Sequence, residues 1–263
     1  MSAALVVAGL KKSFGGVAAV RGIDFTVHAG EAVALIGPNG AGKTTTFNLV
    51  NGQIAPDAGR VTLAGDDITG LAPEALFRRG VARTFQITAT FASMTVRENV
   101  QMALASHARH TPRTGAGWGR YLGWMPAAHA ARAQALIDEQ GLSADAARPA
   151  SELAYGDLKR LELAMAFANA PRLLLMDEPT AGMAPNEREA LMRTAVAACR
   201  ERGVALLFTE HDMDVVFGFA DRVVVMNRGR IIAEGSPDAV QRNDEVRAVY
   251  LGGQPVGAGR GHA

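Results

Sequence analysis

The segment from Gly37 to Thr44 carries the clearest chemical pattern in the sequence, a glycine-rich loop of the form G-x-x-x-x-G-K-[ST]. Such loops bind nucleotide triphosphates, because glycines let the main chain turn tightly and aim successive N–H groups at phosphate oxygens. The alternative is a turn that only joins a strand to a helix. The residues that we predict to contact the nucleotide here are Gly37, Pro38, Asn39, Gly40, Ala41, Gly42, Lys43, Thr44 and Thr45.

Two residues of this loop have further chemical roles. Lys43 places a full positive charge between the β- and γ-phosphates, so we also assign it to catalysis. The hydroxyl of Thr44 is a suitable ligand for Mg²⁺.

Two adjacent carboxylates, Asp177 and Glu178, directly follow an apolar run at residues 173–176. That run predicts a buried strand, and ligands collect at the carboxyl ends of parallel strands. Asp177 can hold the Mg²⁺ shell through water, while Glu178 can polarise a water molecule for attack on the γ-phosphate. A solvated acidic pair that only ends the strand is the alternative.

Two further side chains are expected at the same sheet edge. His211 follows the apolar run at residues 204–209, and an imidazole there can hydrogen-bond the γ-phosphate and hold the attacking water. Gln86 ends the predicted strand 81–86, and its amide can reach the metal or its water from a movable loop. We assign catalytic roles to both and a metal-ligand role to Gln86.

An aromatic residue and a glycine-containing turn complete the set of candidates. Phe14 precedes Gly15 and Gly16, where its ring is either a platform for adenine or part of the core. The segment 151–157 leads into a helix whose apolar residues share one face, which makes an anion site or an ordinary helix start.

The elements that must position these residues indicate an α/β fold. Residues 5–14 and 17–27 read as antiparallel strands, whereas the short apolar runs before the loop and before the carboxylates read as parallel ones. Further strands are expected at 60–63, 81–86, 204–209, 221–226 and 231–234, and helices at 44–50, 73–79, 95–110, 127–140, 158–165, 186–202, 237–241 and 245–251.

Two segments have unusual composition. Residues 111–126 are rich in glycine and contain Trp118, Tyr121 and Trp124, which either dock a partner or cap the core of the helical part. Residues 252–263 contain five glycines and no apolar run, so we expect a disordered tail.

The overall composition excludes several classes of protein. With 263 residues, 48% hydrophobic content and a formal net charge of +1, the chain is globular and has no long-range field to attract nucleic acid or lipid. Cys199 is the only cysteine, so no internal disulfide forms. No signal peptide and no apolar run of ~18 residues is evident, so a membrane role would require a partner.

Taken together, these motifs resemble the nucleotide-binding subunit of an ABC transporter up to about Gly253. Phe14 matches the adenine-stacking aromatic, residues 37–44 Walker A, Gln86 the Q-loop and residues 153–157 the signature. Asp177 and Glu178 match the Walker B aspartate and catalytic glutamate, and His211 the switch histidine. The resemblance implies ATP and Mg²⁺ as cofactors and adds Ala154, Tyr155 and Gly156 to the ATP-binding residues.

Several segments resemble the branched-chain amino acid importers in particular: residues 153–156, 159–162, 176–183, 208–211, the long insertion near 111–126, and the ending 249–252. Urea or amide importers share several of them and are an alternative, as is an ABC ATPase without a transport role. A small-molecule kinase is a more distant alternative.

The resemblance implies an ABC ATPase domain over residues 1–253, followed by the tail 254–263. Within it, about 1–88 and 170–253 would form the catalytic core with its antiparallel β-subdomain, and about 89–169 a helical subdomain. The implied partners are a second ATPase subunit, two membrane permeases and, indirectly, a periplasmic binding protein, with no nucleic acid. The chain would lie on the inner face of the cell membrane.

Two departures from the family pattern are evident. Ala154 stands where the signature usually has serine, which removes one hydroxyl donor to the γ-phosphate. Residues 182–184, Gly-Met-Ala, lack the aspartate that the family places after Walker B. We expect both changes to affect how two ATP sites close and communicate.

Overall fold

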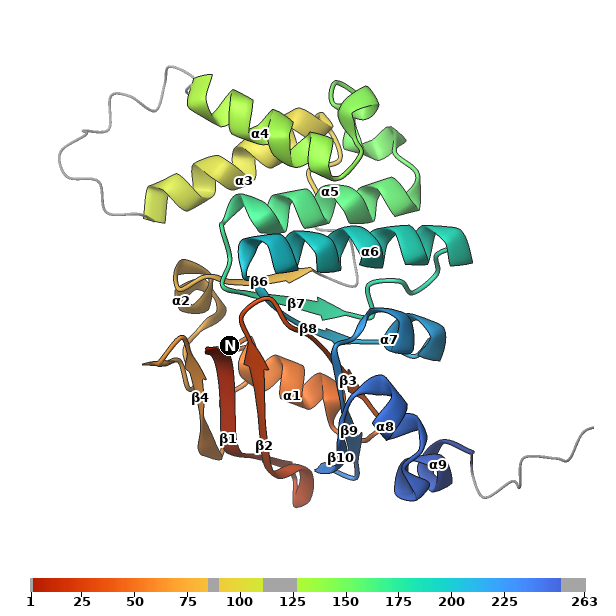
Figure 1. The fold of residues 1–263 in the computed structure, drawn as a ribbon. Coiled ribbons are helices and arrows are strands. Elements are labelled where there is room, and N and C mark those ends of the chain that lie inside the picture. Colours follow the sequence, from red (N-terminus) through yellow and green to blue (C-terminus); the bar gives the residue numbers. More distant parts are fainter. Residues whose placement is uncertain (1, 85–89, 111–126, 252–263) are drawn as a thin grey trace, which may run out of the picture.

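The computed structural model describes residues 2–84, 90–110 and 127–251 (Figure 1). Gln86, the aromatic residues Trp118, Tyr121 and Trp124, and the predicted tail 254–263 lie outside the described residues.

An antiparallel sheet opens the chain, as the alternating pattern predicts. It has the order β2-β1-β4-β5, and its strands are β1 (Ala3–Phe14), β2 (Val17–His28), β4 (Ala58–Leu63) and β5 (Asp66–Asp67). The turn between the first two strands uses Gly15 and Gly16, whose φ angles of 51° and 87° favour glycine.

The second sheet has the order β10-β9-β3-β8-β7-β6. Its strands are β3 (Ala32–Ile36), β6 (Val81–Thr84), β7 (Leu173–Asp177), β8 (Ala205–Thr209), β9 (Arg222–Asn227) and β10 (Arg230–Gly235). All neighbouring pairs are parallel except the hairpin of β9 and β10. The buried apolar runs therefore form parallel strands with both faces covered, as predicted.

The helices cover both sides of this sheet (Figure 1). They are α1 (Lys43–Val50), α2 (Pro73–Arg78), α3 (Val96–His110), α4 (Ala127–Glu139), α5 (Tyr155–Ala168), α6 (Pro185–Arg202), α7 (Met213–Phe219), α8 (Pro237–Gln241) and α9 (Asp244–Leu251), with 3-10 turns at Ser143–Asp145 and Ala150–Glu152. The prediction missed α7, whose sequence MDVVFGF is apolar at five of seven positions and contains a glycine, so it shows no helical alternation of polar and apolar faces. Asp212 nevertheless caps it by accepting the Asp214 N–H.

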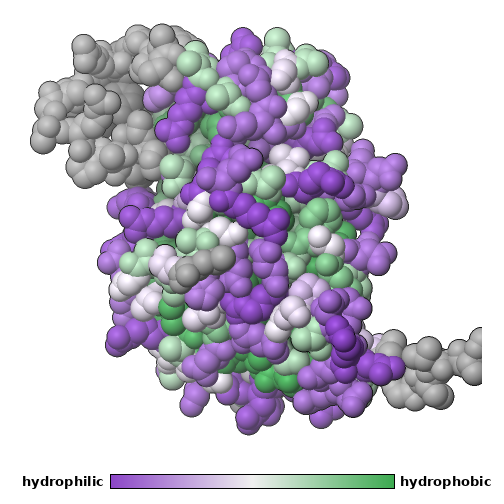
Figure 2. All heavy atoms as spheres, in the orientation of Figure 1, coloured by the Kyte–Doolittle hydropathy of each residue, from purple (hydrophilic) through white to green (hydrophobic). Residues whose placement is uncertain are grey.

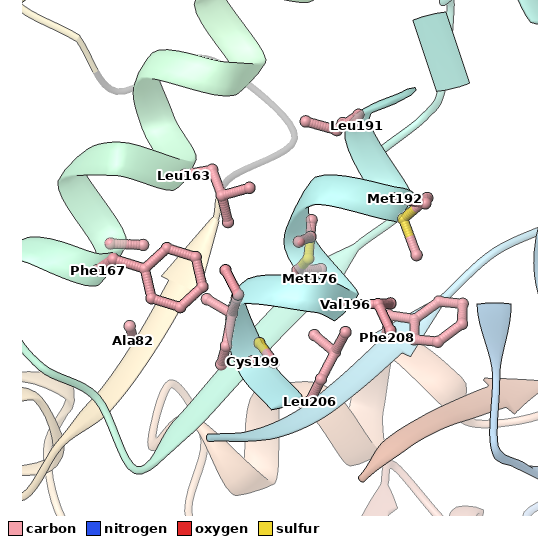
Figure 3. Packing of buried hydrophobic residues seen from close by; sticks show 14 of the residues in the cluster. Ala82, Leu163, Phe167, Met176, Leu191, Met192, Val196, Cys199, Leu206 and Phe208 are labelled. Carbon is pink, nitrogen blue, oxygen red and sulfur yellow. The ribbon is translucent and has the colours of Figure 1, made fainter. Parts of the chain in front are cut away.

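Helix α6 lies between α5 and the sheet and forms the centre of the larger core (Figures 1 and 3). Its residues Met192, Val196 and Cys199 pack among buried side chains of the strands and of α5. Burial raises the pKa of the Cys199 thiol to about 12, with the Arg202 charge opposing the rise, so this cysteine is inert. The core therefore packs the helical layer of α3, α4 and α5, through α6, against the strands.

The visible surface is mixed in character. Hydrophilic residues predominate on the face in Figure 2, with small groups of hydrophobic residues between them. Within the described ranges, no helix combines the length and apolarity required to cross a membrane.

Candidate functional site

The glycine-rich loop joins β3 to α1, which is the strand, loop and helix arrangement that the sequence predicts. Gly37, Gly40 and Gly42 have φ angles of 154°, 77° and 105°, a region that L side chains rarely adopt. A Cβ at Gly37 would overlap the carbonyl oxygen of Met226 on β9. The loop conformation thus requires glycine for both backbone and packing reasons, and it leads directly into the positive end of α1.

Lys43 folds back along this loop and is buried. Its ammonium group donates to the carbonyls of Gly37, at 2.6 Å, and Pro38, at 3.2 Å. Burial lowers the pKa of Lys43, and the negative charges of Glu178 and Asp177 partly oppose this change. The lysine therefore lies within electrostatic range of both carboxylates, in a loop shaped for anions.

Asp177 ends β7 with both carboxylate oxygens engaged. Oδ1 accepts the hydroxyl of Thr209, at 2.7 Å, and Oδ2 accepts a guanidinium N–H of Arg83, at 3.0 Å. Arg83 also donates to the Asn48 amide oxygen on α1, at 3.3 Å. Three strands and the helix after the loop thus hold this carboxylate in one orientation.

Glu178 and His211 meet at the same sheet edge, as the sequence predicts. His211 Nε2 and Glu178 Oε1 are 2.9 Å apart. Glu178 has a φ of 47°, an unusual value for a non-glycine residue, and its N–H donates to the carbonyl and the hydroxyl oxygen of Thr209, both at 3.1 Å. Strained backbone that is held by several bonds is typical of functional sites.

Phe14 is 47% exposed at the end of β1, so the alternative of a core residue is wrong. The ammonium group of Lys12 lies 5.6 Å from its ring centroid and is itself bound to Asp57, at 2.8 Å. An exposed ring with one cationic neighbour can stack against a nucleotide base.

The signature residues lie at the start of α5. Ala154 is the N-cap residue, and its side chain provides no capping bond, which agrees with the loss of the hydroxyl noted above. Tyr155 is exposed, and the Lys159 ammonium group lies 5.5 Å from its ring centroid. A Cβ at Gly156 would lie 3.3 Å from the Glu187 carboxyl group, so a larger residue here would require that side chain to shift slightly.

The structure does not bring the signature turn to the phosphate loop of the same chain. Helices α5 and α1 lie in different layers, with β7 and β8 between them (Figure 1). The loop, Asp177, Glu178 and His211 lie at one edge of the parallel sheet, whereas Phe14 ends a strand of the antiparallel sheet.

The donor set fits Mg²⁺ better than a transition metal. No group of three or more His, Cys, Asp or Glu side chains with metal-site geometry occurs among the described residues. Thr44 is exposed at the start of α1, and Asp177 supplies a carboxylate. Mg²⁺ is typically held by one or two protein oxygens together with substrate phosphates and water, which matches a hydroxyl and one carboxylate.

Sequence reasoning missed two residues of the site and the role of a third. Arg83 and Thr209 bind Asp177, but they belong to ordinary strand patterns that give no sign of this pairing. Tyr250 of α9 hydrogen-bonds the main chain of Gly37; burial raises the pKa of its phenol, and this bond opposes the rise. The ending 249–252 was noted only as a family resemblance, and nothing in the local pattern of α9 indicates the contact of Tyr250 with Gly37.

Comparison with known families agrees with this geometry. Residues 20–181 match the family model described as ABC transporter. Residues 230–255 match a second model, described as branched-chain amino acid ATP-binding cassette transporter.

Curated relatives are similar over nearly the whole chain. The high-affinity branched-chain amino acid transport ATP-binding protein BraF of Pseudomonas aeruginosa is 38% identical over 254 residues, which are 94% of this chain and 97% of the relative. LivG of Escherichia coli K12, which has the same description, is 39% identical over 256 residues, with the same coverage.

Solved structures show the same fold. The ADP conformation of MJ1267, an ATP-binding cassette of an ABC transporter, matches with a TM-score of 0.82 and 29% identity, covering 96% of this chain and all of the other. A nucleotide-free ATP-binding cassette from an ABC transporter matches with a TM-score of 0.80 and 28% identity, covering 95% and 99%.

Proposed function

Because this chain belongs to the ABC transporter family and has its nucleotide-binding fold, we propose that it is the ATP-hydrolysing subunit of a branched-chain amino acid importer. The observation that carries the cargo class is the similarity to BraF and LivG over 94% of the chain. The match of residues 230–255 to the branched-chain model supports it from a separate segment.

The geometry supports specific roles in ATP hydrolysis. The main-chain N–H groups of residues 37–45, apart from Pro38, which has none, and the positive end of α1 bind the phosphates, with Lys43 neutralising their charge, and Phe14 stacks on adenine. Glu178 orients and polarises the attacking water, and His211, 2.9 Å from it, holds that carboxylate and donates to the γ-phosphate. Gln86, outside the described residues, is proposed as the sensor of the γ-phosphate and the metal.

Thr44, Asp177 and Gln86 are the residues proposed to hold Mg²⁺. When bound, the ion neutralises negative charge that develops on the phosphate oxygens. Asp177 can serve as a ligand because Thr209 and Arg83 already fix its orientation.

Two chains are proposed to form the complete site. Ala154, Tyr155 and Gly156 lie in a different layer from the phosphate loop, so they would bind ATP held by a second ATPase subunit. With no serine at 154, the N–H groups of Tyr155 and Gly156 and the positive end of α5 supply the contacts. The partner is an identical or a related chain, and a monomer should hydrolyse ATP slowly.

The proposed docking site for the permeases is a cavity of about 680 Å³ between the helical layer and β6. Its walls include Phe91 and Met102, both exposed apolar side chains, and Met165 of α5. Arg83 also lines it and pairs with Asp177 at the ATP site. A permease segment in this cavity would therefore lie one side chain from the metal-binding carboxylate, which offers a route for coupling.

This docking site can be tested with two substitutions of equal charge. Met102→Glu puts a carboxylate into the apolar cavity, so permeases should no longer co-purify with the tagged full-length chain. Ala130→Glu, at an exposed position of α4, is the control and should leave co-purification unchanged. Normal co-purification of the Met102 variant would exclude this cavity as the docking site.

The cargo and the place of action need an experiment in cells. Tagged chain should co-purify with integral permeases at the inner face of the membrane, and deletion of its gene should abolish uptake of labelled leucine, isoleucine and valine. Loss of urea or amide uptake instead would favour the alternative importer, which shares several of the same motifs. Absence of any permease in the purified material would favour an ABC ATPase without a transport role.

A further inference from the structure

Two turns beside the ATP site are joined to each other at several points. Residues 178–184 follow β7 and lead into α6; we call residues 180–184 the α6 entry turn. Residues 210–212 follow β8 and include His211. The contact between Glu178 and His211, at 2.9 Å, is one junction, and further junctions lie on both sides of it.

Glu210, directly before His211, forms the second junction. It is buried, and its Oε1 accepts the N–H and the hydroxyl of Thr180, at 2.9 and 2.7 Å. Its other oxygen accepts the N–H of His211, at 3.2 Å. A buried carboxylate with three donors fixes the start of the entry turn against the histidine.

Arg188, in the first turn of α6, forms the third junction. Its Nε donates to the carbonyl of Met183, at 2.7 Å, and its Nη1 donates to Asp212 Oδ2, at 2.5 Å. The other oxygen of Asp212 caps α7 by accepting the Asp214 N–H, at 3.0 Å. One planar guanidinium therefore joins the end of the entry turn to the residue after His211.

The surroundings place this junction beside a surface that a second protomer can reach. Within the entry turn Thr180 and Met183 are buried, whereas Ala181, Gly182 and Ala184 are exposed and available to a second protomer. The turn has no aspartate of its own; the Glu210 carboxylate holds its start at Thr180, and the Arg188 guanidinium joins its end to Asp212. Both side chains of the Arg188–Asp212 pair are about 30% exposed, which limits screening by salt.

We propose that Arg188 is a positioning residue for ATP hydrolysis: it fixes His211 to the α6 entry turn, so that contact of that turn with the second ATPase protomer sets the position of the histidine. Arg188 acts through Asp212 and Met183 and does not touch ATP. The inference rests on the proposed catalytic role of His211.

The test is a double-mutant cycle on the full-length protein in the complex with which it co-purifies. Arg188→Gln and Asp212→Asn should each lower kcat about 10-fold, since small displacements of a catalytic group have effects of this order, while the KM for ATP changes less than about 2-fold. The kcat of the double variant should be no lower than that of either single variant, because the two substitutions break the same connection. Arg188→Lys should give an intermediate rate, because an ammonium cannot reproduce both directed bonds.

Arg193→Gln is the matched control. Arg193 lies on the same helix and pairs with Glu189 on the exposed face, so kcat should remain that of the wild type. Thermal melting of every variant checks that each is folded.

Three outcomes would separate the possibilities. A wild-type kcat in a folded Arg188→Gln variant, or losses that multiply to ~100-fold in the double variant, would overturn the inference. If His211→Ala itself hydrolyses ATP at the normal rate, the assigned role of the histidine fails, and this inference fails with it. If His211→Ala is inactive while both Arg188→Gln and Asp212→Asn are normal, only this inference fails.

Discussion

Nε2 of His211 lies 2.9 Å from Oε1 of Glu178, although the two residues are 33 positions apart in the sequence. They follow neighbouring parallel strands, β8 and β7, whose register pairs Asp177 with Thr209. The pair therefore depends on the sheet, and it places an imidazole and a carboxylate side by side at the edge where a nucleotide bound by the phosphate loop would end.

His211→Ala should lower kcat at least about 100-fold with little change in the KM for ATP, because the histidine acts on the γ-phosphate and the water rather than on the rest of the nucleotide. Steady-state ATPase assays of the complex check this. The control is His28→Ala on β2, outside the site, which should keep the normal rate. A large increase in KM with unchanged kcat would instead assign His211 to ground-state binding.

Lys43→Met should separate stability from function. Burial disfavours the charged lysine, so an apolar side chain of similar length should leave the melting temperature of the nucleotide-free protein unchanged or higher. Affinity for ATP should fall about 10- to 100-fold with the loss of a charged donor. Calorimetric melting and titration with ATP test the two parts, and Lys11→Met, on the exposed side of β1, is the control. Unchanged ATP affinity would contradict the assignment of Lys43.

Gly37→Ala and Gly40→Ala should differ strongly, although both glycines have positive φ and belong to one loop. A methyl group at Gly37 overlaps the Met226 carbonyl, whereas nothing lies within 4 Å of a methyl group at Gly40. Gly40→Ala should cost about 1 kcal/mol of stability from backbone strain alone, and Gly37→Ala should cost more and displace the loop. Urea unfolding measures the loss of stability in each variant, and titration with ATP measures the loss of affinity. Equal losses in the two variants would mean that the loop adapts to a methyl group at Gly37.

Acidification should weaken the junction of the two sheets at Glu31. Burial alone would raise the pKa of Glu31, but hydrogen bonds from the Arg222 side chain and the His28 N–H, with the Arg222 charge, lower it below its ordinary value of 4.5. The stability from this group is therefore fully present above pH 4.5 and lost as the pH falls through its lowered folded-state pKa.

The free energies of unfolding of the wild type and the Glu31→Gln variant, measured with urea, should thus differ at pH 7. They should approach each other as the pH falls to the lowest value at which the protein is still folded. Glu74→Gln, in an exposed pair with Arg78, is the control and should show little difference at either pH. If the difference in unfolding free energy between the wild type and Glu31→Gln did not change with pH, the charge of Glu31 would not be the source of the stabilisation.

Much of the fold and the centre of the site follow from local patterns. Buried apolar runs predict the parallel strands, and residues directly after them, such as Glu178 and His211, must then share an edge. The glycine loop is specified by its own residues. The sequence also predicts the exposed turn at Gly15 and Gly16, because only their backbone is involved.

The supporting contacts could not be predicted in this way. Arg83 binds Asp177 across 94 positions and Arg188 binds Asp212 across 24, and nothing near either arginine differs from an ordinary strand or helix. Tyr250 reaches Gly37 from the last described helix. Such pairs are set by the packing of whole elements, so they appear only in three dimensions.

The most direct test of the account is the Glu178→Gln variant, assayed for ATP binding and for ATP hydrolysis in the same preparation. The amide keeps the shape and the contact with His211 but cannot accept a proton from water, so ATP should bind with normal affinity while turnover nearly disappears. Hydrolysis at the wild-type rate would contradict the account, because water would then be activated without this carboxylate.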